Sequence, residues 1–237
     1  GDNTGRAYIF HNDGSIPTTA ATADVIITGE TTSNSFGVSL ASGDFNADGT
    51  TDLAVGASQY STSTGRAYIF HNDGSIPTTA ATADVTITGE TTSNSFGVSL
   101  ASGDFNADGE TDLAVGASQY STSTGRVYIF YNDGSIPTTA GTADVTITGA
   151  TSTSFGGALT SGDFNSDSKI DLAVGAYAYS SSTGRAYIFY NDGSIPTTAA
   201  TADVTLTGEA TSSTYGSALA SGDFNADGKT DLVVGAS

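Results

Sequence analysis

The stretch DFNADGTTD, residues 44–52, decides how the rest of the sequence is interpreted. It returns as DFNADGETD from Asp104, as DFNSDSKID from Asp163 and as DFNADGKTD from Asp223. Each copy places oxygen-bearing side chains at its first, third, fifth and ninth positions. Asp, Asn and Gly are also ordinary turn residues, but a pattern kept in four copies indicates a function for the loop.

The loop belongs to a longer repeated unit. Segments of the type GRAYIF begin at Gly5, Gly65, Gly125 and Gly184, so the period is 60, 60 and 59 residues. Residues 5–64 and 65–124 differ at only two positions, where Ile26 and Thr50 are replaced by Thr86 and Glu110. Such near-identity indicates copies that are recently duplicated or engineered.

Each unit reads as short strands separated by turns. Segments rich in β-branched, aromatic and small residues alternate with clusters of Gly, Asn, Asp, Ser and Thr, and helical periodicity is nowhere sustained. In one unit we expect strands at residues 37–45, 52–57, 65–71 and 84–89. The sequence therefore predicts an all-β protein.

Four short strands per unit favour a β-propeller with one blade per unit. We expect a single domain over residues 1–237, made of four four-stranded blades. The chain opens with the third and fourth strands of a unit and stops after the first two. The prediction is a ring closed by pairing of the N-terminal and C-terminal strands. Two alternatives stay open, a homodimer that forms an eight-bladed ring and a fragment of a longer propeller.

The charge of the chain limits its partners. The formal net charge is −19, from 25 acidic and six basic side chains, so nucleic acid and anionic membrane surfaces would repel it. The chain has no cysteine, and it has no apolar run of the ~20 residues that a membrane helix needs. We expect a soluble protein, in a mature or trimmed form, that inserts in no membrane and has cations as its natural partners.

The acidic loop suits a hard divalent cation. Calcium takes six to eight oxygen ligands in flexible geometry, and Asp44, Asn46, Asp48 and Asp52 would offer them around a turn at Gly49. The carbonyl of Thr50 would add one more. The loop is not an EF-hand, because its twelfth position is Val55 where a bidentate Glu is required.

Residues 36–57, FGVSLASGDFNADGTTDLAVGA, resemble the FG-GAP repeat of integrin α-subunit propellers and of their bacterial and fungal relatives. The resemblance covers all four units. It implies a β-propeller with one calcium ion in the loop that joins the first and second strands of each blade, up to four in all. The candidate metal ligands in the four loops, with the position-seven residues contributing their backbone carbonyls, are Asp44, Asn46, Asp48, Thr50 and Asp52; Asp104, Asn106, Asp108, Glu110 and Asp112; Asp163, Asn165, Asp167, Lys169 and Asp171; and Asp223, Asn225, Asp227, Lys229 and Asp231.

Two features depart from that family. Ser168 stands where the other three loops have Gly, so we expect the third loop to be strained or to bind more weakly. Integrin-like propellers usually have seven blades, whereas this chain has four units. A four-bladed ring would resemble haemopexin-like domains.

A second candidate surface follows from the polar segments after the second strand of each unit. By family analogy these segments lie on the face opposite the calcium loops, where integrin-like propellers bind ligands. The tyrosines there could stack on sugar rings, and the candidate ligand-binding residues are Tyr60, Tyr120, Tyr177 and Tyr179. The alternative is a solvated polar loop. The repeated arginines, such as Arg66, are expected to pair with a neighbouring acid or with backbone carbonyls.

Together these features predict a non-enzymatic, calcium-binding propeller that acts outside the cell as a binding or adhesion module, with a glycan or a protein as its ligand. A lectin is the most specific version. The alternative is a purely structural or engineered repeat propeller with no ligand beyond calcium. No catalytic set of Ser, His and Asp stands out in the sequence, and the two histidines, His11 and His71, are replaced by Tyr in later units.

Overall fold

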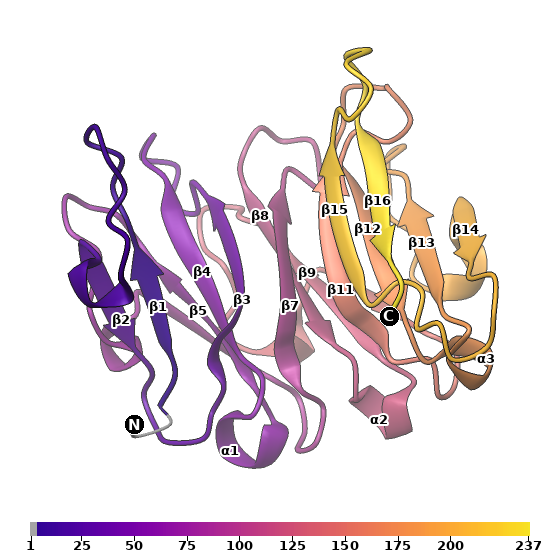
Figure 1. Cartoon of the computed structure of the whole chain (residues 1–237), viewed down its shortest axis with the longest axis horizontal. Coiled ribbons are helices and arrows are strands. Elements are labelled where there is room, and N and C mark those ends of the chain that lie inside the picture. Colours follow the sequence, from indigo (N-terminus) through magenta and orange to yellow (C-terminus); the bar gives the residue numbers. More distant parts are fainter. Residues whose placement is uncertain (1–3) are drawn as a thin grey trace.

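The computed structural model describes residues 4–237, which form a row of antiparallel sheets arranged in an open arc (Figure 1). Three of the sheets have four strands each, and a two-stranded sheet lies at each end. We call the four-stranded sheets blades 1 to 3. Blade 1 contains β3 (Phe36–Gly43), β4 (Asp52–Ala57), β5 (Arg66–Phe70) and β6 (Val85–Thr88). Blade 2 contains β7 (Phe96–Gly103), β8 (Asp112–Ala117), β9 (Arg126–Phe130) and β10 (Val145–Thr148).

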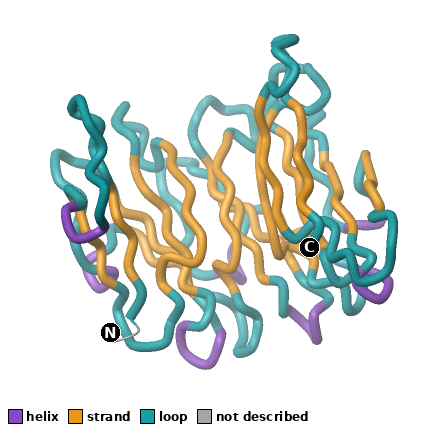
Figure 2. Tube along the Cα trace, viewed as in Figure 1, coloured by secondary structure: helices purple, strands orange, loops and turns teal. Residues whose placement is uncertain are grey.

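Blade 3 contains β11 (Phe155–Gly162), β12 (Asp171–Ala176), β13 (Arg185–Phe189) and β14 (Val204–Thr207). The N-terminal half-blade contains β1 (Arg6–Ile9) and β2 (Val25–Thr28), and the C-terminal half-blade contains β15 (Ala218–Gly222) and β16 (Asp231–Gly235). Loops connect the strands (Figure 2), and some of these loops contain a short turn of helix. These turns are the helical turns α1 (Tyr60–Ser63), α2 (Tyr120–Ser123) and α3 (Tyr179–Ser182) after the second strand of each blade, and the 3₁₀ turns η1 (Ala20–Thr22), η2 (Ala80–Thr82), η3 (Ala140–Thr142) and η4 (Ala199–Thr201) before the last strand of each sheet that has one.

The strands predicted from the sequence are confirmed to within two residues at each end, and the all-β class is confirmed. Inside each blade the order is that of an up-and-down meander, with β3-β4-β5-β6 as the first example. Within residues 4–237 no helix is long and apolar enough to cross a membrane.

The closed ring predicted from the sequence is not present in this structure. β1 pairs with β2 and β15 pairs with β16, and in the described part of the chain neither half-blade pairs with the other. The two half-blades lie at opposite ends of the arc (Figure 1). Contacts between neighbouring blades set the curvature of the arc. With this curvature the unpaired edge of β1 does not meet the unpaired edge of β16.

The core of each blade is aromatic. The Phe of the FG pair packs edge-on against two rings of its own blade, with Phe36 lying 5.7 Å from Tyr68 and 6.2 Å from Phe70 between ring centroids. All three side chains are buried. Edge-to-face aromatic pairs add to the stabilisation that burial of their area provides, so the FG phenylalanine anchors the first strand of the blade on the third.

Neighbouring blades approach one another through glycines. A Cβ atom added at Gly56 of β4 would lie 2.0 Å from the carbonyl oxygen of Gly97 in the next blade. Gly97 is itself the glycine of an FG pair and has φ +84°. The hydroxyl of Ser39 donates to the same carbonyl oxygen at 2.8 Å. The FG and VGA glycines are therefore required because two backbones meet at this point with no room for a side chain.

This close approach predicts a large difference between two glycine substitutions in blade 2. In Gly116→Ala the new Cβ would lie 2.1 Å from Gly156 O and 2.2 Å from Ser99 Oγ, so we expect a loss of roughly 2–4 kcal/mol in the free energy of unfolding. Gly141→Ala is the matched control. Its Cβ has no neighbour closer than 3.8 Å, and the other repeats already carry Ala there.

Urea unfolding followed by circular dichroism measures both variants. The control should change the free energy of unfolding by no more than about 0.5 kcal/mol. Equal stability of the two variants would show that the glycine contact does not constrain the packing of the blades.

Candidate metal loops and the arginine clusters

The four acidic loops occupy one end of the sheets. Each loop joins the first strand of a blade to the second, so residues 44–51 precede β4, whereas the turn α1 follows β4. The two features consequently lie at opposite ends of the blade, and α1, α2 and α3 line one edge of the arc (Figure 1). This arrangement agrees with the predicted separation of the acidic loops from the tyrosine-bearing turns.

In the first loop the side-chain oxygens accept hydrogen bonds from backbone N–H groups of the same loop. Asp44 Oδ1 and Asn46 Oδ1 both accept a hydrogen bond from the backbone N–H of Asp48, at 3.1 Å each. Asp44 Oδ2 accepts from Gly49 N–H at 2.8 Å, and Asp48 Oδ1 accepts from Thr50 N–H at 2.7 Å. Oxygens from the first, third and fifth positions are thereby brought to one small region.

The other three loops repeat this geometry. The fifth-position N–H donates to the first-position carboxylate at 3.0 Å in each of them and to the third-position Asn at 2.9–3.0 Å. The seventh-position residues donate their backbone N–H to the fifth-position carboxylate, as in the first loop. These residues are Glu110, Lys169 and Lys229.

In the first three loops the ninth-position aspartate is buried and ties the loop to the end of the third strand. Asp112 is 0% exposed, and its two oxygens accept from the N–H of Phe105 at 2.7 Å and of Asn132 at 2.8 Å. Asp52 and Asp171 make the equivalent pairs of bonds. Asp231 accepts from Phe224 alone among the described residues. A buried carboxylate that fixes two backbone segments positions the loop whether or not an ion is bound.

The donor set has the chemistry that calcium requires, since carboxylate and carboxamide oxygens are grouped in every loop and each oxygen has more than one lone pair. Within residues 4–237, no group of three or more Asp, Glu, His or Cys side chains is already arranged as a metal site. One ligand in each loop is an Asn, and in the first three loops the ninth-position Asp points to two backbone N–H groups. Binding would therefore draw on the first, third and fifth side chains and on a shift of the ninth.

The pKa values in the loops record two opposing effects. Hydrogen bonds from Thr50 and from Asn46 lower the pKa of Asp48 to about 2. Burial raises the pKa of Asp112 to about 6; its two backbone hydrogen bonds oppose this rise, and the charges of Asp108 and Asp104 add to it. The buried carboxylate thus holds its proton more tightly than an ordinary Asp, and a cation at the loop would relieve this repulsion.

Ser168 keeps the loop geometry at a conformational cost. Its φ is +71°, close to the +84° to +95° of the glycines at the same position in the other loops, and its N–H still donates to Asp163 Oδ2 at 2.9 Å. A side chain in the left-handed region raises the energy of the backbone by ~1–2 kcal/mol. The third loop is therefore formed but strained, as the sequence predicted.

The predicted ligand-binding tyrosines are largely engaged by arginine. The guanidinium carbon of Arg66 lies 3.7 Å from the centre of the Tyr60 ring, and Arg66 Nη1 lies 2.6 Å from Glu30 Oε2. The hydroxyl of Tyr68 donates to the same Glu30 oxygen at 2.9 Å. We call this set of four side chains an Arg–Tyr–Glu cluster. One face of Tyr60 is thus unavailable for sugar stacking.

Blade 2 repeats the cluster with Arg126, Tyr120, Tyr128 and Glu90. The ion pair is 3.1 Å long, and the ring of Tyr120 lies 3.8 Å from the guanidinium. The expectation that the repeated arginines pair with a neighbouring acid is confirmed for Arg66 and Arg126, but the sequence reasoning did not identify Glu30 and Glu90 as the acids. Alignment of the units would have shown that Glu recurs at this position.

The turns that carry the tyrosines are unusual. Ser61, Thr62 and Ser63 have φ values between +46° and +59°, a left-handed turn of non-glycine residues. The next unit stabilises it, since Ser93 N–H donates to Thr62 O at 3.0 Å and Asn94 N–H donates to Ser63 O at 2.9 Å. The tyrosine surface is therefore a rigid junction between units. Tyr177 packs beside Gly157, where an added Cβ would lie 2.9 Å from its ring.

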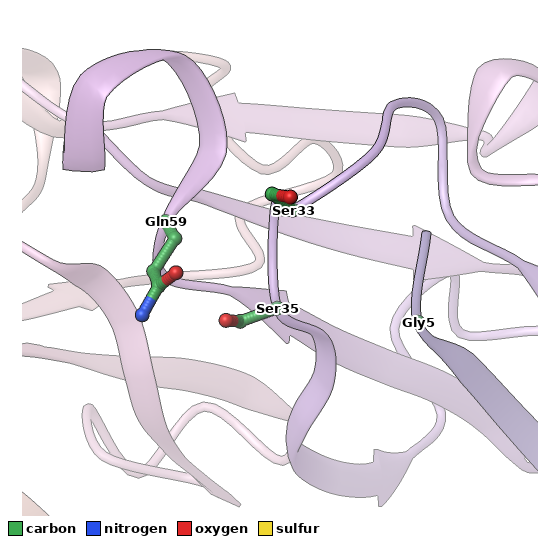
Figure 3. Close-up of a pocket in the computed structure, with 4 residues that line it drawn as sticks. All are labelled: Gly5, Ser33, Ser35 and Gln59. Atoms are coloured by element: carbon green, nitrogen blue, oxygen red, sulfur yellow. The ribbon is translucent and has the colours of Figure 1, made fainter. Parts of the chain in front are cut away.

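A pocket of about 440 Å³ lies at the N-terminal end of the same edge (Figure 3). Gly5, Ser33, Ser35 and Gln59 line it, and none of these side chains is charged. In the next unit Ser93, the counterpart of Ser33, donates its backbone N–H to Thr62 O. The counterpart of Thr62 is residue 2, which lies outside the described residues. We assign no function to this pocket.

With the geometry in view, comparison with known proteins identifies the family. The model of the FG-GAP repeat matches residues 36–70 and 96–130, and the model of an FG-GAP-like repeat matches residues 163–234. The matched segments contain the aromatic anchors, the acidic loops and the inter-blade glycines described above. The chain belongs to the FG-GAP repeat family.

Curated relatives show which branch of the family the chain resembles. It is 33% identical over 219 residues to integrin alpha-PS2 of Drosophila melanogaster, which is 84% of this chain and 15% of the integrin. It is 36% identical over 151 residues to the phosphatidylinositol-glycan-specific phospholipase D of Rattus norvegicus, which is 57% of this chain and 18% of that enzyme. The chain thus spans less than a fifth of the length of these relatives.

The strain at Ser168 predicts that Ser168→Gly stabilises the protein by about 1 kcal/mol, because glycine adopts this φ without a steric penalty. Gly228→Ser is the matched opposite change in the fourth loop and should destabilise by a similar amount. Urea unfolding at fixed ionic strength measures both. A loss of stability in Ser168→Gly would show that the serine side chain contributes more than its backbone strain costs.

Proposed function

We propose that this chain is a calcium-stabilised, propeller-type binding or adhesion module that acts outside the cell and has no enzymatic activity of its own. The observation that supports it most directly is the identical grouping of Asp, Asn and Asp oxygens in four loops, each formed around its own backbone N–H groups. A net charge of −19 adds a general attraction for cations.

Calcium suits these loops better than magnesium or zinc. The loops offer neutral and charged oxygens and no thiolate or imidazole, which excludes the ligands that zinc prefers. Calcium tolerates irregular oxygen geometry, whereas magnesium demands a near-ideal octahedron. Sites of ~10⁻⁴–10⁻³ M affinity are filled in extracellular fluid and empty in resting cytosol, so an extracellular location follows from the proposal.

The relatives include both integrins and an enzyme, so they bear on whether this chain has an enzymatic activity. The named enzyme shares with this chain a segment that is 18% of its length, and integrin relatives share the same repeat. A repeat common to integrins and to an enzyme supports a scaffold or binding role for the repeat itself. We therefore place this chain among binding modules.

The ligand surface that we propose is the edge of the arc formed by the tyrosine-bearing turns, opposite the acidic loops. A glycan or a protein would contact the ring faces that arginine leaves free and the surrounding Ser and Thr hydroxyls. The competing interpretation is a structural or engineered repeat without a ligand beyond calcium, and the near-identity of the first two units favours it. Glycan-array binding separates the two.

We further propose that the arc assembles with a second copy of the chain. The exposed large apolar side chains include Tyr8 on β1, Val38 and Leu40 on β3, and Phe224 and Val233 in the C-terminal half-blade. Tyr68 and Leu100, the counterparts of Tyr8 and Leu40 inside the arc, are buried. Apolar surface gathered at both ends of the arc supports end-to-end association.

The edges of the two half-blades are complementary in register and in charge. In blade 1, Val55 of β4 pairs with Tyr68 of β5, and by the same register Val234 of β16 would pair with Tyr8 of β1. Glu209 is the counterpart of Glu30 and Arg6 is the counterpart of Arg66, and Glu30 and Arg66 form an ion pair. Among the described residues neither Glu209 nor Arg6 is in an ion pair. Pairing at both ends of two chains would give an eight-bladed ring with two-fold symmetry.

Calcium binding predicts a metal-dependent stability. In millimolar calcium the melting temperature should be higher than in excess chelator, because an ion that binds only the folded state adds ~2.7 kcal/mol per site at a hundredfold excess over its Kd. Differential scanning calorimetry measures the shift.

Asp104→Asn combined with Asp108→Asn removes two charges and leaves one acceptor oxygen on each side chain in place of two, so it should reduce the calcium-dependent part of the shift. Its melting temperature in chelator serves as the control. An identical melting temperature with calcium and with chelator in the unmodified chain would refute the proposed function.

End-to-end assembly predicts a mass twice the 23.6 kDa of the chain by multi-angle light scattering. Val233→Lys places a charge on the exposed edge of β16 and should give monomers. Thr50→Lys is the control, since two of the loops already carry Lys at this position, and it should remain dimeric. A monomeric mass for the unmodified chain would contradict the assembly.

A further inference from the structure

The third arginine lacks the acid that the first two have. In the segment that follows the last strand of each sheet, Glu30 and Glu90 are the acids of the first two clusters, but Ala150 occupies this position before blade 3. Glu209 stands at the same position in the fourth unit. One of four equivalent positions has therefore lost its carboxylate.

The rest of the cluster is retained in blade 3. The guanidinium of Arg185 lies 3.6 Å from the centre of the Tyr179 ring, and its Nε donates to Thr207 Oγ1 at 3.1 Å. Within residues 4–237 Arg185 is in no ion pair. In the same part of the chain the hydroxyl of Tyr187, a residue that is 3% exposed as a whole, has no hydrogen-bond partner, whereas that of Tyr128 donates to Glu90 at 2.7 Å.

A pocket occupies the place of the missing side chain. It has a volume of about 330 Å³, and Ala150, Tyr179, Arg185, Tyr187 and Ala200 contribute to its lining. In blade 2 the counterpart of Ala200 is Gly141, where an added Cβ would lie 3.8 Å from Glu90 Oε1. The pocket of blade 3 thus coincides with the position that a glutamate carboxylate fills in blade 2.

We propose that this pocket binds the carboxylate of a ligand, which takes the place of the side chain absent at Ala150. The carboxylate would accept hydrogen bonds from the guanidinium of Arg185 and the hydroxyl of Tyr187, as Glu30 does from Arg66 and Tyr68. The fitting group is a carboxylate on two methylenes, the chemistry of a glutamate side chain or of a small aliphatic acid.

Two physical points support a site of this kind. Arg185 is held by its stacking on Tyr179 and by Thr207, so little side-chain entropy is lost when an anion binds. The net charge of −19 opposes anions at long range, but at physiological ionic strength charges beyond ~8 Å are screened. Binding in this pocket requires no metal and is independent of the calcium proposal.

The test uses propionate, which carries the same two carbons and carboxylate, in the full-length chain with calcium present. Titration is followed by the Nε–H resonances of the arginines in NMR spectra at 0.15 M salt. We expect a saturable shift of Arg185 with a Kd on the order of millimolar, and no saturable shift of Arg66 or Arg126. Propionamide, the neutral isostere, should leave all three unchanged.

Ala150→Glu restores the internal acid. It should raise the melting temperature, move the Arg185 resonance toward those of Arg66 and Arg126, and weaken propionate binding at least tenfold. Ala150→Gln is its matched control, because it fills the pocket without a charge. Persistence of the Arg185 shift in Ala150→Glu would overturn the proposal, as would an equal response to propionamide or no saturable shift in the unmodified chain.

The opposite change provides an independent readout in blade 2. Glu90→Ala should open an equivalent pocket beside Arg126 and create a second propionate site of similar affinity, seen as a new saturable shift of Arg126. Failure of Arg126 to respond in this folded variant would show that the cluster does not take a free carboxylate. A glutamate-containing tripeptide, compared with propionate, then distinguishes an acidic side chain from a small free acid as the source of the carboxylate.

Discussion

The whole arc depends on the contact of one glycine with the carbonyl of another in the next blade. Gly56, Gly116 and Gly175 each approach a carbonyl oxygen so closely that an added Cβ would lie 2.0–2.1 Å away. This contact sets how near each blade stands to the next, and the aromatic anchors and the serine hydrogen bonds act at that spacing. The two glycine motifs that characterise the family, FG and VGA, are the two sides of one backbone contact.

The sequence predicted the repeat, the strand positions and the arrangement of the acidic loops, because each of these is set by local chemistry. Strand periodicity, turn residues and the spacing of Asp44, Asn46 and Asp48 are all read within a few residues. It did not predict the open arc, because the curvature results from many small contacts between blades. The sequence also did not reveal the left-handed turn of Ser61, Thr62 and Ser63. Its conformation is fixed by hydrogen bonds from the backbone N–H groups of Ser93 and Asn94, which lie about thirty residues further along the chain.

The two ends of each blade are built on opposite electrostatic principles. At the acidic loops, carboxylates crowd together, and backbone N–H groups, side-chain donors such as Asn46 and a bound cation offset their repulsion. At the tyrosine-bearing turns, each positive charge is placed on an aromatic ring and, in the first two clusters, is neutralised by a glutamate of the preceding unit. The aspartate at Asp112 connects the acidic loop to the third strand, so a cation bound at one end would stiffen the strand that carries the arginine at the other.

The linear order of contacts has a consequence for how the molecule loses its structure. The inner strands β3, β7, β11 and β15 touch in sequence, so a blade in the middle of the arc is held from two sides and a half-blade from one. In such an array local unfolding begins at the ends and advances one unit at a time. Amide protons should then exchange fastest in the half-blades and slowest in β8 and β9, even though the units are nearly identical in sequence. Position in the row, rather than composition, would determine the lifetime of each hydrogen bond.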